Sequence, residues 1–167
     1  MLIDLAEIRR LGEKMRGENE RFRRFMKSRD IPERRLRKIA EEIQAQIDCT
    51  ACANCCRVAT AEVSNRDVER LARHLNLTPG AFRSQYTVRD EEGAAVLRRN
   101  ENGCVFLNGT ECTVYEGRPA TCVDFPHLVR GSGSIASRMW QFIDRACYCP
   151  IVFNSLQAFK AHLRFQR

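Results

Sequence analysis

Four cysteines stand within eight residues of this chain and form a CxxCxxCC block, made of Cys49, Cys52, Cys55 and Cys56. A CxxC spacing lets two thiolates turn toward one centre about 4 Å apart, which is the geometry that zinc ions and iron–sulfur clusters need. Five more cysteines follow at Cys104, Cys112, Cys122, Cys147 and Cys149. The types and spacing of these residues predict that metal binding is the function of the chain, or its precondition.

A disulfide scaffold is the alternative use of so many cysteines. The first ten residues show no basic region followed by an apolar run, so we expect no signal peptide and a cytoplasmic location. Disulfides are rare in the reducing cytosol. Nine cysteines in 167 residues also fall below the density of disulfide scaffolds, and an odd number leaves one thiol unpaired. Metal ligation is therefore the preferred interpretation.

The length and charge of the chain limit the classes of protein to consider. A chain of 167 residues suits one domain, or one domain with a helical extension. No apolar run approaches the ~20 residues that span a membrane. The net charge is +7, but the basic residues alternate with acidic ones, which is typical of solvated helix faces. We expect a protein or redox partner, no dedicated nucleic-acid site and no membrane segment.

Two helices are predicted to carry the cysteine block. Apolar residues recur at helical spacing from residue 3 to about residue 28, although Gly12 and Gly17 weaken this helix. A second helix begins at Pro32 and runs directly into Cys49. We predict that residues 1–48 form an N-terminal helical hairpin and that residues 49–167 form the cysteine-cluster metal-binding domain, which packs with the hairpin as one compact unit.

The rest of the chain alternates short elements with turn signals. Ser64 and Asp67 have the spacing of a capping box, and Thr78-Pro79 begins another short helix. Two or three short strands are expected between residues 87 and 107, and helices at about 136–146 and 150–164. The predicted fold class is mainly α with a few short strands, in a small, irregular, cysteine-rich domain.

The downstream cysteines have distinctive neighbours. Cys104 begins C-V-F-L, Cys149 precedes Pro150, and residues 112–126 read C-T-V-Y-E-G-R-P-A-T-C-V-D-F-P. Together with the CxxCxxCC block, and in this order, these motifs resemble the YkgJ-type cysteine-cluster family of zinc- or iron-chelating proteins. The resemblance covers roughly Cys49 to Pro150. It implies eight metal ligands, with Cys147 as the extra thiol: Cys49, Cys52, Cys55, Cys56, Cys104, Cys112, Cys122 and Cys149.

The identity of the metal stays open at this point. Eight thiolates could form two four-cysteine zinc sites, one [4Fe–4S] cluster beside structural thiols, or a polynuclear site. The later cysteines lack the paired CxxC steps of zinc ribbons, and a C-x₂-C-x₂-C run also occurs in bacterial ferredoxins. We predict an iron–sulfur cluster, with [4Fe–4S] favoured, in a redox or sensing role. The alternatives are a zinc-binding structural or interaction module and an iron–sulfur enzyme with an unidentified substrate.

Two further expectations concern the residues beside the ligands. The Cβ vectors of the adjacent Cys55 and Cys56 diverge, so the two thiols should serve different roles. This favours a centre bridged between the first block and the Cys104–Cys122 segment. A thiolate centre is negatively charged, which makes Arg57 and Arg118 the candidate cofactor-binding residues. No hydrolase or nucleotide-binding signature is present in the sequence, so whether the protein is an enzyme stays open and no catalytic residue is assigned.

Overall fold

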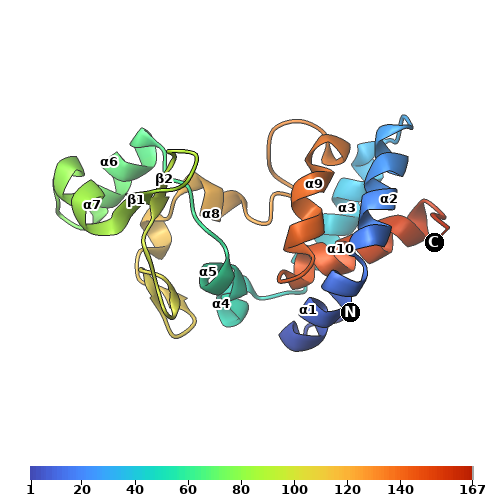
Figure 1. The fold of residues 1–167 in the computed structure, drawn as a ribbon, viewed down its shortest axis with the longest axis horizontal. Helices are drawn as coiled ribbons and strands as arrows, with labels where there is room; N and C mark the ends of the chain where they lie inside the picture. The colour runs from blue at the N-terminus through green and yellow to red at the C-terminus, as the bar shows by residue number, and fades with distance from the viewer. Residues whose placement is uncertain (167) are drawn as a thin grey trace. The chain divides into compact units, whose positions relative to one another are not determined.

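The structure, a computed structural model, describes residues 1–166, and its contacts group the chain into two compact units (Figure 1). The helical unit contains residues 1–48 and the chain from Pro126 onward, whereas the cysteine unit contains residues 49–125. Helices account for 56% of the residues, which confirms the predicted mainly α class. The predicted division into a hairpin and a domain from residue 49 onward stays a prediction, and the structure adds that the chain rejoins the helical unit at Pro126.

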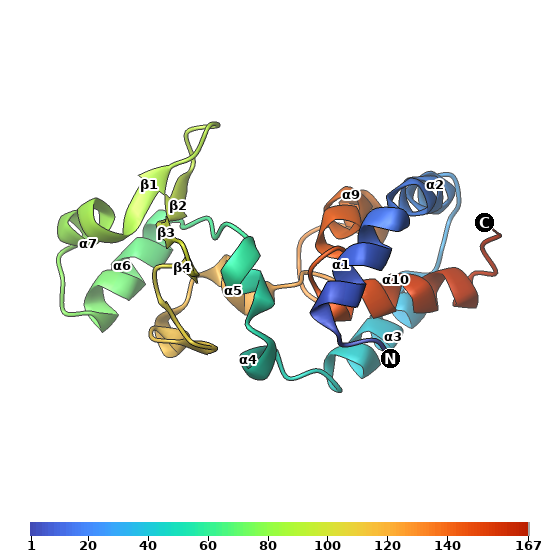
Figure 2. The same ribbon diagram turned by 60° about the horizontal axis from the view of Figure 1, so that its bottom comes forward.

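The described helices of the helical unit are α1 (Leu5–Lys14), α2 (Arg16–Lys27), α3 (Glu33–Gln44), α9 (Ile135–Arg145) and α10 (Pro150–His162). Helix α2 packs on α9 and α3 packs on α10 (Figure 2). The helix expected over residues 3–28 is instead two helices, because Met15 leaves the helical conformation between α1 and α2. Large buried side chains form the core: Ile8, Phe22, Met26, Leu36, Ile135, Met139, Phe142, Ile151, Leu156 and Phe159.

Gly12 allows α1 to approach the connection between α9 and α10. A Cβ atom at Gly12 would lie 2.6 Å from the Cα atom of Cys147 and 2.7 Å from the carbonyl oxygen of Ala146. Both neighbours are backbone atoms, which cannot turn aside as a side chain can. The glycine that weakens the helix in isolation is therefore required by the packing of the helical unit.

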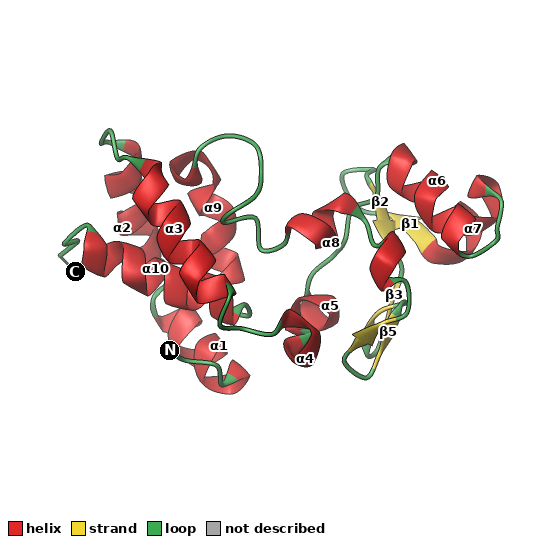
Figure 3. Cartoon of the chain, turned by 180° about the vertical axis from the view of Figure 1, so that it is seen from behind, coloured by secondary structure: helices red, strands yellow, loops and turns green. Residues whose placement is uncertain are grey.

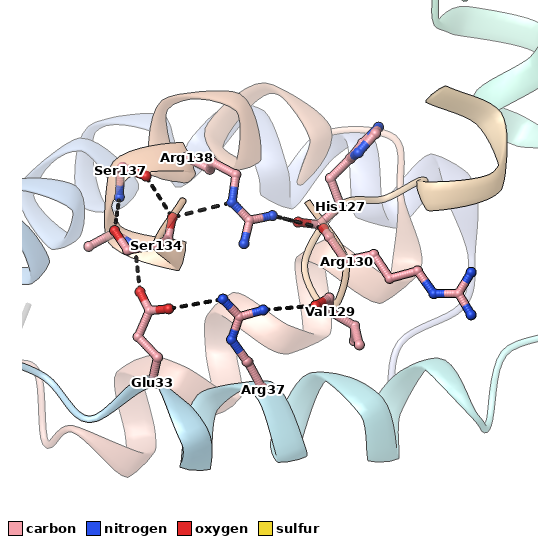
Figure 4. A network of polar contacts seen from close by, with 9 residues as sticks. Glu33, Arg37, His127, Val129, Arg130, Ser134, Ser137 and Arg138 are labelled. Atoms are coloured by element: carbon pink, nitrogen blue, oxygen red, sulfur yellow. Dashed lines mark hydrogen bonds and ion pairs between the residues drawn. The ribbon is translucent and has the colours of Figure 1, made fainter. Parts of the chain in front are cut away.

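Arginines hold the loop that enters α9, residues 126–134 (Figure 4). The Arg138 guanidinium donates to the carbonyl oxygens of His127, Arg130 and Ser134, the last at 3.2 Å. Arg37 of α3 donates to the carbonyl oxygen of Val129 at 2.9 Å. Because the loop has few apolar residues, these charge-assisted bonds to its backbone fix its course.

The cysteine unit consists of short elements (Figure 3). Its helices are α4 (Cys49–Cys52), α5 (Asn54–Val58), α6 (Asn65–His74), α7 (Pro79–Tyr86), the 3₁₀ helix η1 (Tyr115–Gly117) and α8 (Ala120–Asp124). Its strands are β1 (Thr87–Arg89), β2 (Ala95–Leu97), β3 (Arg99–Asn100), β4 (Gly103–Cys104), β5 (Leu107–Asn108) and β6 (Glu111–Cys112). They form three separate antiparallel pairs, β1–β2, β3–β4 and β5–β6.

Local signals set the starts of the first two longer helices of the cysteine unit. The capping box predicted at Ser64 and Asp67 is confirmed at the start of α6. Thr78 accepts from the Ala81 N–H and precedes Pro79, as predicted for α7. Apolar residues of α6, α7 and the strands then pack together into one core: Val63, Val68, Leu71, Ala72, Phe82, Leu97, Phe106 and Val114.

The cysteine block is helical, although the sequence suggested a loop. Helices α4 and α5 each make about one turn, and Ala53 joins them in a left-handed conformation with φ of 47°. The Ala53 N–H donates to the Cys49 carbonyl oxygen at 2.9 Å, and its own carbonyl oxygen accepts from the Cys56 N–H at 3.1 Å. Segments this short carry no periodicity that could reveal them. Within residues 1–166, no helix has the length and apolar character needed to cross a membrane.

Candidate metal centre

Close backbone packing brings Cys104 to Cys56. Gly103 lies in β4 with φ of +120°, and a Cβ atom there would be 2.5 Å from the Cys56 carbonyl oxygen and 2.8 Å from the Arg57 Cα atom. Only glycine tolerates both this conformation and this approach. Helix α4 in turn packs on β6, whose last residue is Cys112. The CxxCxxCC block therefore meets the elements that carry Cys104 and Cys112 within the cysteine unit.

Four thiols lie within electrostatic range of one another, and we call Cys56, Cys104, Cys112 and Cys122 the four-thiol set. A charge on Cys56 raises the pKa of each of the other three. Cys112 raises the pKa of both Cys104 and Cys122, and Cys104 raises that of Cys122. Every pair is thus coupled. The four residues come from α5, β4, β6 and α8, so the set joins four separate elements.

The members of this set differ in the ease with which they ionise. Burial raises the pKa of Cys104 and of Cys112, and it raises that of Cys122 to about 12. The pKa of Cys56 is lowered to about 6, first by a hydrogen bond from the Cys55 thiol and then by the charges of Arg57, Arg99 and Arg118. One thiolate is therefore favoured at neutral pH, and a cation would be needed to stabilise the others.

Backbone donors face two of the sulfurs. The Phe106 N–H donates to the Cys104 thiol, and the Val114 N–H donates to the Cys112 thiol. Each donor stands two residues after the cysteine that it contacts. Such bonds favour the ionised form of the thiol. The short hairpins thus position sulfur atoms together with groups that stabilise their negative charge.

Arg118 has a donor without an acceptor beside the four-thiol set. Its guanidinium carbon lies 3.7 Å from the centre of the Tyr115 ring, and its Nη1 atom is buried with no hydrogen-bond partner. Its charge lowers the pKa of Cys56, Cys112 and Cys122. A buried guanidinium nitrogen without a partner, beside thiols, fits an anionic metal–thiolate group. The donor set and this orphaned nitrogen are thus compatible with a resident metal centre.

Arg57, the other predicted cofactor-binding residue, contacts backbone in this structure. Its Nη1 atom donates to the Cys52 carbonyl oxygen at 2.8 Å and its Nη2 atom to the Gly109 carbonyl oxygen at 3.0 Å. These bonds tie α4 and α5 to the turn between β5 and β6. The charge of Arg57 still lowers the pKa of Cys56. Its role is therefore to hold the block in place as well as to stabilise a thiolate.

Asp67 and Arg70 support the centre in a way that the sequence did not indicate. Asp67 is buried and accepts from the Ala120 N–H at 3.0 Å, at the start of α8, as well as from Arg70 at 2.6 Å. Arg70 also donates to the Arg118 carbonyl oxygen at 2.8 Å. From the capping box, the sequence predicted a role for Asp67 only at the start of its own helix. Its second contact anchors the segment that leads to Cys122.

The remaining cysteines fall into two groups. Cys49, Cys52 and Cys55 belong to α4 and α5, with Cys49 exposed and the other two half-buried. Cys147 and Cys149 are buried in the helical unit, where the Cys147 thiol donates to the Ile143 carbonyl oxygen at 3.6 Å. Across residues 1–166, no three Cys, His, Asp or Glu side chains form a ready-made site for one metal ion. The predicted eight-cysteine ligand set stays a prediction.

A protein-family model matches residues 48–150, and its description is "CxxCxxCC: Putative zinc- or iron-chelating domain". The chain belongs to this CxxCxxCC family. Neither the search of curated proteins nor that of solved structures finds a match. The resemblance expected from the motifs is confirmed, and membership of the CxxCxxCC family makes this chain a metal-binding cysteine-cluster protein of the zinc- or iron-chelating kind.

Proposed function

We propose that this CxxCxxCC protein holds an iron–sulfur cluster, with [4Fe–4S] favoured, through the four-thiol set, and that the cluster serves a redox or sensing role. The observation that carries the proposal is the packing of β4 on α5 at Gly103 and of α4 on β6, which brings Cys104 and Cys112 to the cysteine block, together with the mutual electrostatic coupling of Cys56, Cys104, Cys112 and Cys122. A [4Fe–4S] cluster takes four cysteine thiolates. The set supplies that number from four elements, with one cysteine taken from the CxxCxxCC block.

The surroundings of the set support an electron-transfer or sensing role. The bound cluster would supply one-electron chemistry. The N–H groups of Phe106 and Val114 would donate to ligand sulfurs, which raises the reduction potential of such clusters. Arg118 would place its unpaired Nη1 donor toward the negative charge. Burial of the Cys122 thiol restricts the access of water to that ligand.

Structural zinc is the second candidate, and one observation favours it. The cysteine unit has strands of only two or three residues and a small apolar core. A single zinc ion bound by four thiolates from α5, β4, β6 and α8 would cross-link the unit, as closed four-cysteine sites do. In that case the metal would stabilise a structural or interaction module. The chemistry of the ligands suits either metal.

Anaerobic purification followed by metal and acid-labile sulfide analysis tests the proposal. We expect iron and sulfide in equal amounts and a visible absorption band that dithionite bleaches. Cys122→Ser should lose iron and sulfide, whereas the matched control Cys147→Ser, which replaces a cysteine of the helical unit, should retain both. Stoichiometric zinc without sulfide would contradict the iron–sulfur proposal and support the zinc candidate. A chain that binds neither metal would overturn both.

A further inference from the structure

We propose that the helical unit binds an inorganic phosphate ion between α3 and α9, where the side chains of Arg37 and Arg138 face each other. The ion accepts hydrogen bonds from both guanidinium groups and donates one from its own O–H group to Glu33. The site involves no cysteine, so it stands apart from the proposed function of the four-thiol set.

Arg138 has a donor atom that no other residue of the described chain satisfies. The residue is only 7% exposed, so it is more than nine-tenths buried. Its Nε and Nη1 atoms donate to the carbonyl oxygens of Ser134, His127 and Arg130. Within residues 1–166, its buried Nη2 atom has no hydrogen-bond partner. A buried donor on a charged group is costly to leave unpaired, which indicates an acceptor that binds from outside the chain.

The unpaired atom points toward a second guanidinium group. Figure 4 shows Arg138 Nη2 directed across the network to Arg37 of α3. Arg37 is held in place because its Nη1 atom donates to the Val129 carbonyl oxygen at 2.9 Å and its Nη2 atom donates to Glu33 at 3.3 Å. Each Nη atom carries two N–H groups, so Arg37 keeps further donors. Its half-buried side chain leaves a route from solvent to the space between the two arginines.

The charges around Arg138 favour an anion over a water molecule in this space. Burial and the positive charges of Arg37 and Arg145 lower the pKa of Arg138, whereas the Glu33 carboxylate raises it. Three guanidinium groups therefore stand against one carboxylate. Water would accept from Nη2 and leave the excess charge in place. An oxyanion supplies several acceptor oxygens together with negative charge, and arginine pairs with such groups through parallel hydrogen bonds.

Glu33 determines which oxyanion fits. Its Oε1 atom accepts from the Ala136 N–H at 3.3 Å, in the first turn of α9, and its Oε2 atom accepts from Arg37. An ionised carboxylate can only accept hydrogen bonds. Sulfate has no proton at neutral pH and would place oxygen against oxygen at Glu33. Inorganic phosphate keeps at least one O–H group that donates to the carboxylate, so the site selects phosphate.

Isothermal titration of the full chain with inorganic phosphate, in a chloride buffer at neutral pH, tests the site. We expect wild type to bind phosphate and to bind sulfate roughly tenfold more weakly. Arg37→Gln should weaken phosphate binding roughly tenfold, because hydrogen bonds from a charged group are lost. The matched control Arg35→Gln, which replaces an exposed arginine of the same helix, should leave it unchanged. Glu33→Gln should bring sulfate binding close to phosphate binding.

Hydrogen exchange of the wild type locates the ion without any substitution. Phosphate should slow exchange in residues 127–138 and leave residues 65–86 unchanged. Absence of phosphate binding would overturn the proposal, and so would equal weakening by Arg37→Gln and Arg35→Gln or protection outside residues 127–138 alone. Equal affinity of the wild type for sulfate and phosphate would overturn the selection by Glu33.

Discussion

The helical unit and the cysteine unit of this protein are stabilised in different ways. The helical unit buries three complete phenylalanine side chains, Phe22, Phe142 and Phe159, between helices of ten to thirteen residues. The cysteine unit has a smaller core around Phe82, and its strands occur as isolated pairs, which are marginal on their own in water. Apolar burial therefore accounts for the stability of the helical unit. The cysteine unit has only a small apolar core and contains seven cysteines.

The two units also differ in what surrounds one of their buried cationic groups. In the helical unit, Lys160 is paired with Glu18 at 2.7 Å and both side chains are largely buried. In the cysteine unit, Arg118 keeps a buried Nη1 atom without a partner. A buried donor atom without a partner is costly, and a metal–thiolate centre would supply an acceptor with negative charge. The helical unit also has guanidinium nitrogens without a partner, at Arg23 and Arg138, but the one at Arg118 stands beside the four-thiol set. We infer that bound metal completes this part of the cysteine unit.

Metal removal should have the largest effect, and it should act on one unit only. Binding of structural zinc contributes about 10–16 kcal/mol in small peptides, which exceeds or matches the ~5–15 kcal/mol net stability of a domain. We expect hydrogen exchange protection to collapse in residues 49–125 after anaerobic chelation and to persist in α2, α3, α9 and α10. Equal protection of both units after verified metal removal would contradict the comparison.

Replacement of single cysteines should have the second-largest effect, and this effect should differ between the two units. Cys122→Ser removes a member of the four-thiol set and should abolish retention of its metal, because a serine hydroxyl is a poor substitute for a thiolate. Cys147→Ser should leave the metal content unchanged and act only on the packing of the helical unit. The ligand set implied by the family predicts a larger loss of metal for Cys149→Ser than for Cys147→Ser. Metal analysis of the three variants tests these expectations. A larger loss of metal from Cys147→Ser than from Cys149→Ser would exclude Cys149 from the ligand set.

Two glycine substitutions make a matched pair across the units. At Gly103, alanine meets backbone at 2.5 Å in a left-handed conformation, so we expect a cost of about 1–3 kcal/mol and weakened metal retention. At Gly12, alanine meets the Cys147 Cα atom at 2.6 Å, so we expect a similar cost from overpacking with unchanged metal retention. Chemical denaturation and metal analysis measure the two effects. Loss of metal from Gly12→Ala but not from Gly103→Ala would be the opposite of what this account requires.

The smallest effect concerns alkaline pH and the helical unit. Burial raises the pKa of Tyr148 to about 12, above its ordinary value of 10.0. The neutral phenol therefore stabilises the folded state fully below pH 10, and this contribution is lost as the pH rises through about 12. We expect the stability of the helical unit to fall between these values, less steeply in Tyr148→Phe. Chemical denaturation of the wild type and of Tyr148→Phe at pH 9 and pH 11 tests this. An equal loss of unfolding free energy in both proteins would refute it.

Local signals in the sequence predicted a large part of the fold. The serine and threonine caps before α6 and α7 and the proline that begins α10 act within one turn, so their effects can be read from neighbouring residues. The break at Met15 and the helical form of the cysteine block were missed. The helices of the cysteine block are too short to carry a periodicity, and the packing of α1 near the break involves a segment distant in sequence, as the approach of Gly12 to Cys147 shows.

The cysteines as a group could be predicted, but their partition could not. Spacing and motifs identify them as metal ligands, and the divergence of adjacent Cβ vectors predicts that Cys55 and Cys56 differ. Which of the two faces Cys104 depends on the approach of β4 to α5 at Gly103, a tertiary contact across some fifty residues. The second role of Asp67, at the start of α8, is long-range in the same sense.

A comparison of Cys55→Ser with Cys56→Ser tests the central claim most directly, because the two cysteines are neighbours and the substitutions are chemically identical. Each variant is purified anaerobically as the full chain, and iron, zinc and acid-labile sulfide are measured together with thermal unfolding. We expect Cys56→Ser to lose the centre held with Cys104, Cys112 and Cys122, and Cys55→Ser to retain it. Retention by Cys56→Ser with loss from Cys55→Ser would contradict the assignment of Cys56 to the four-thiol set.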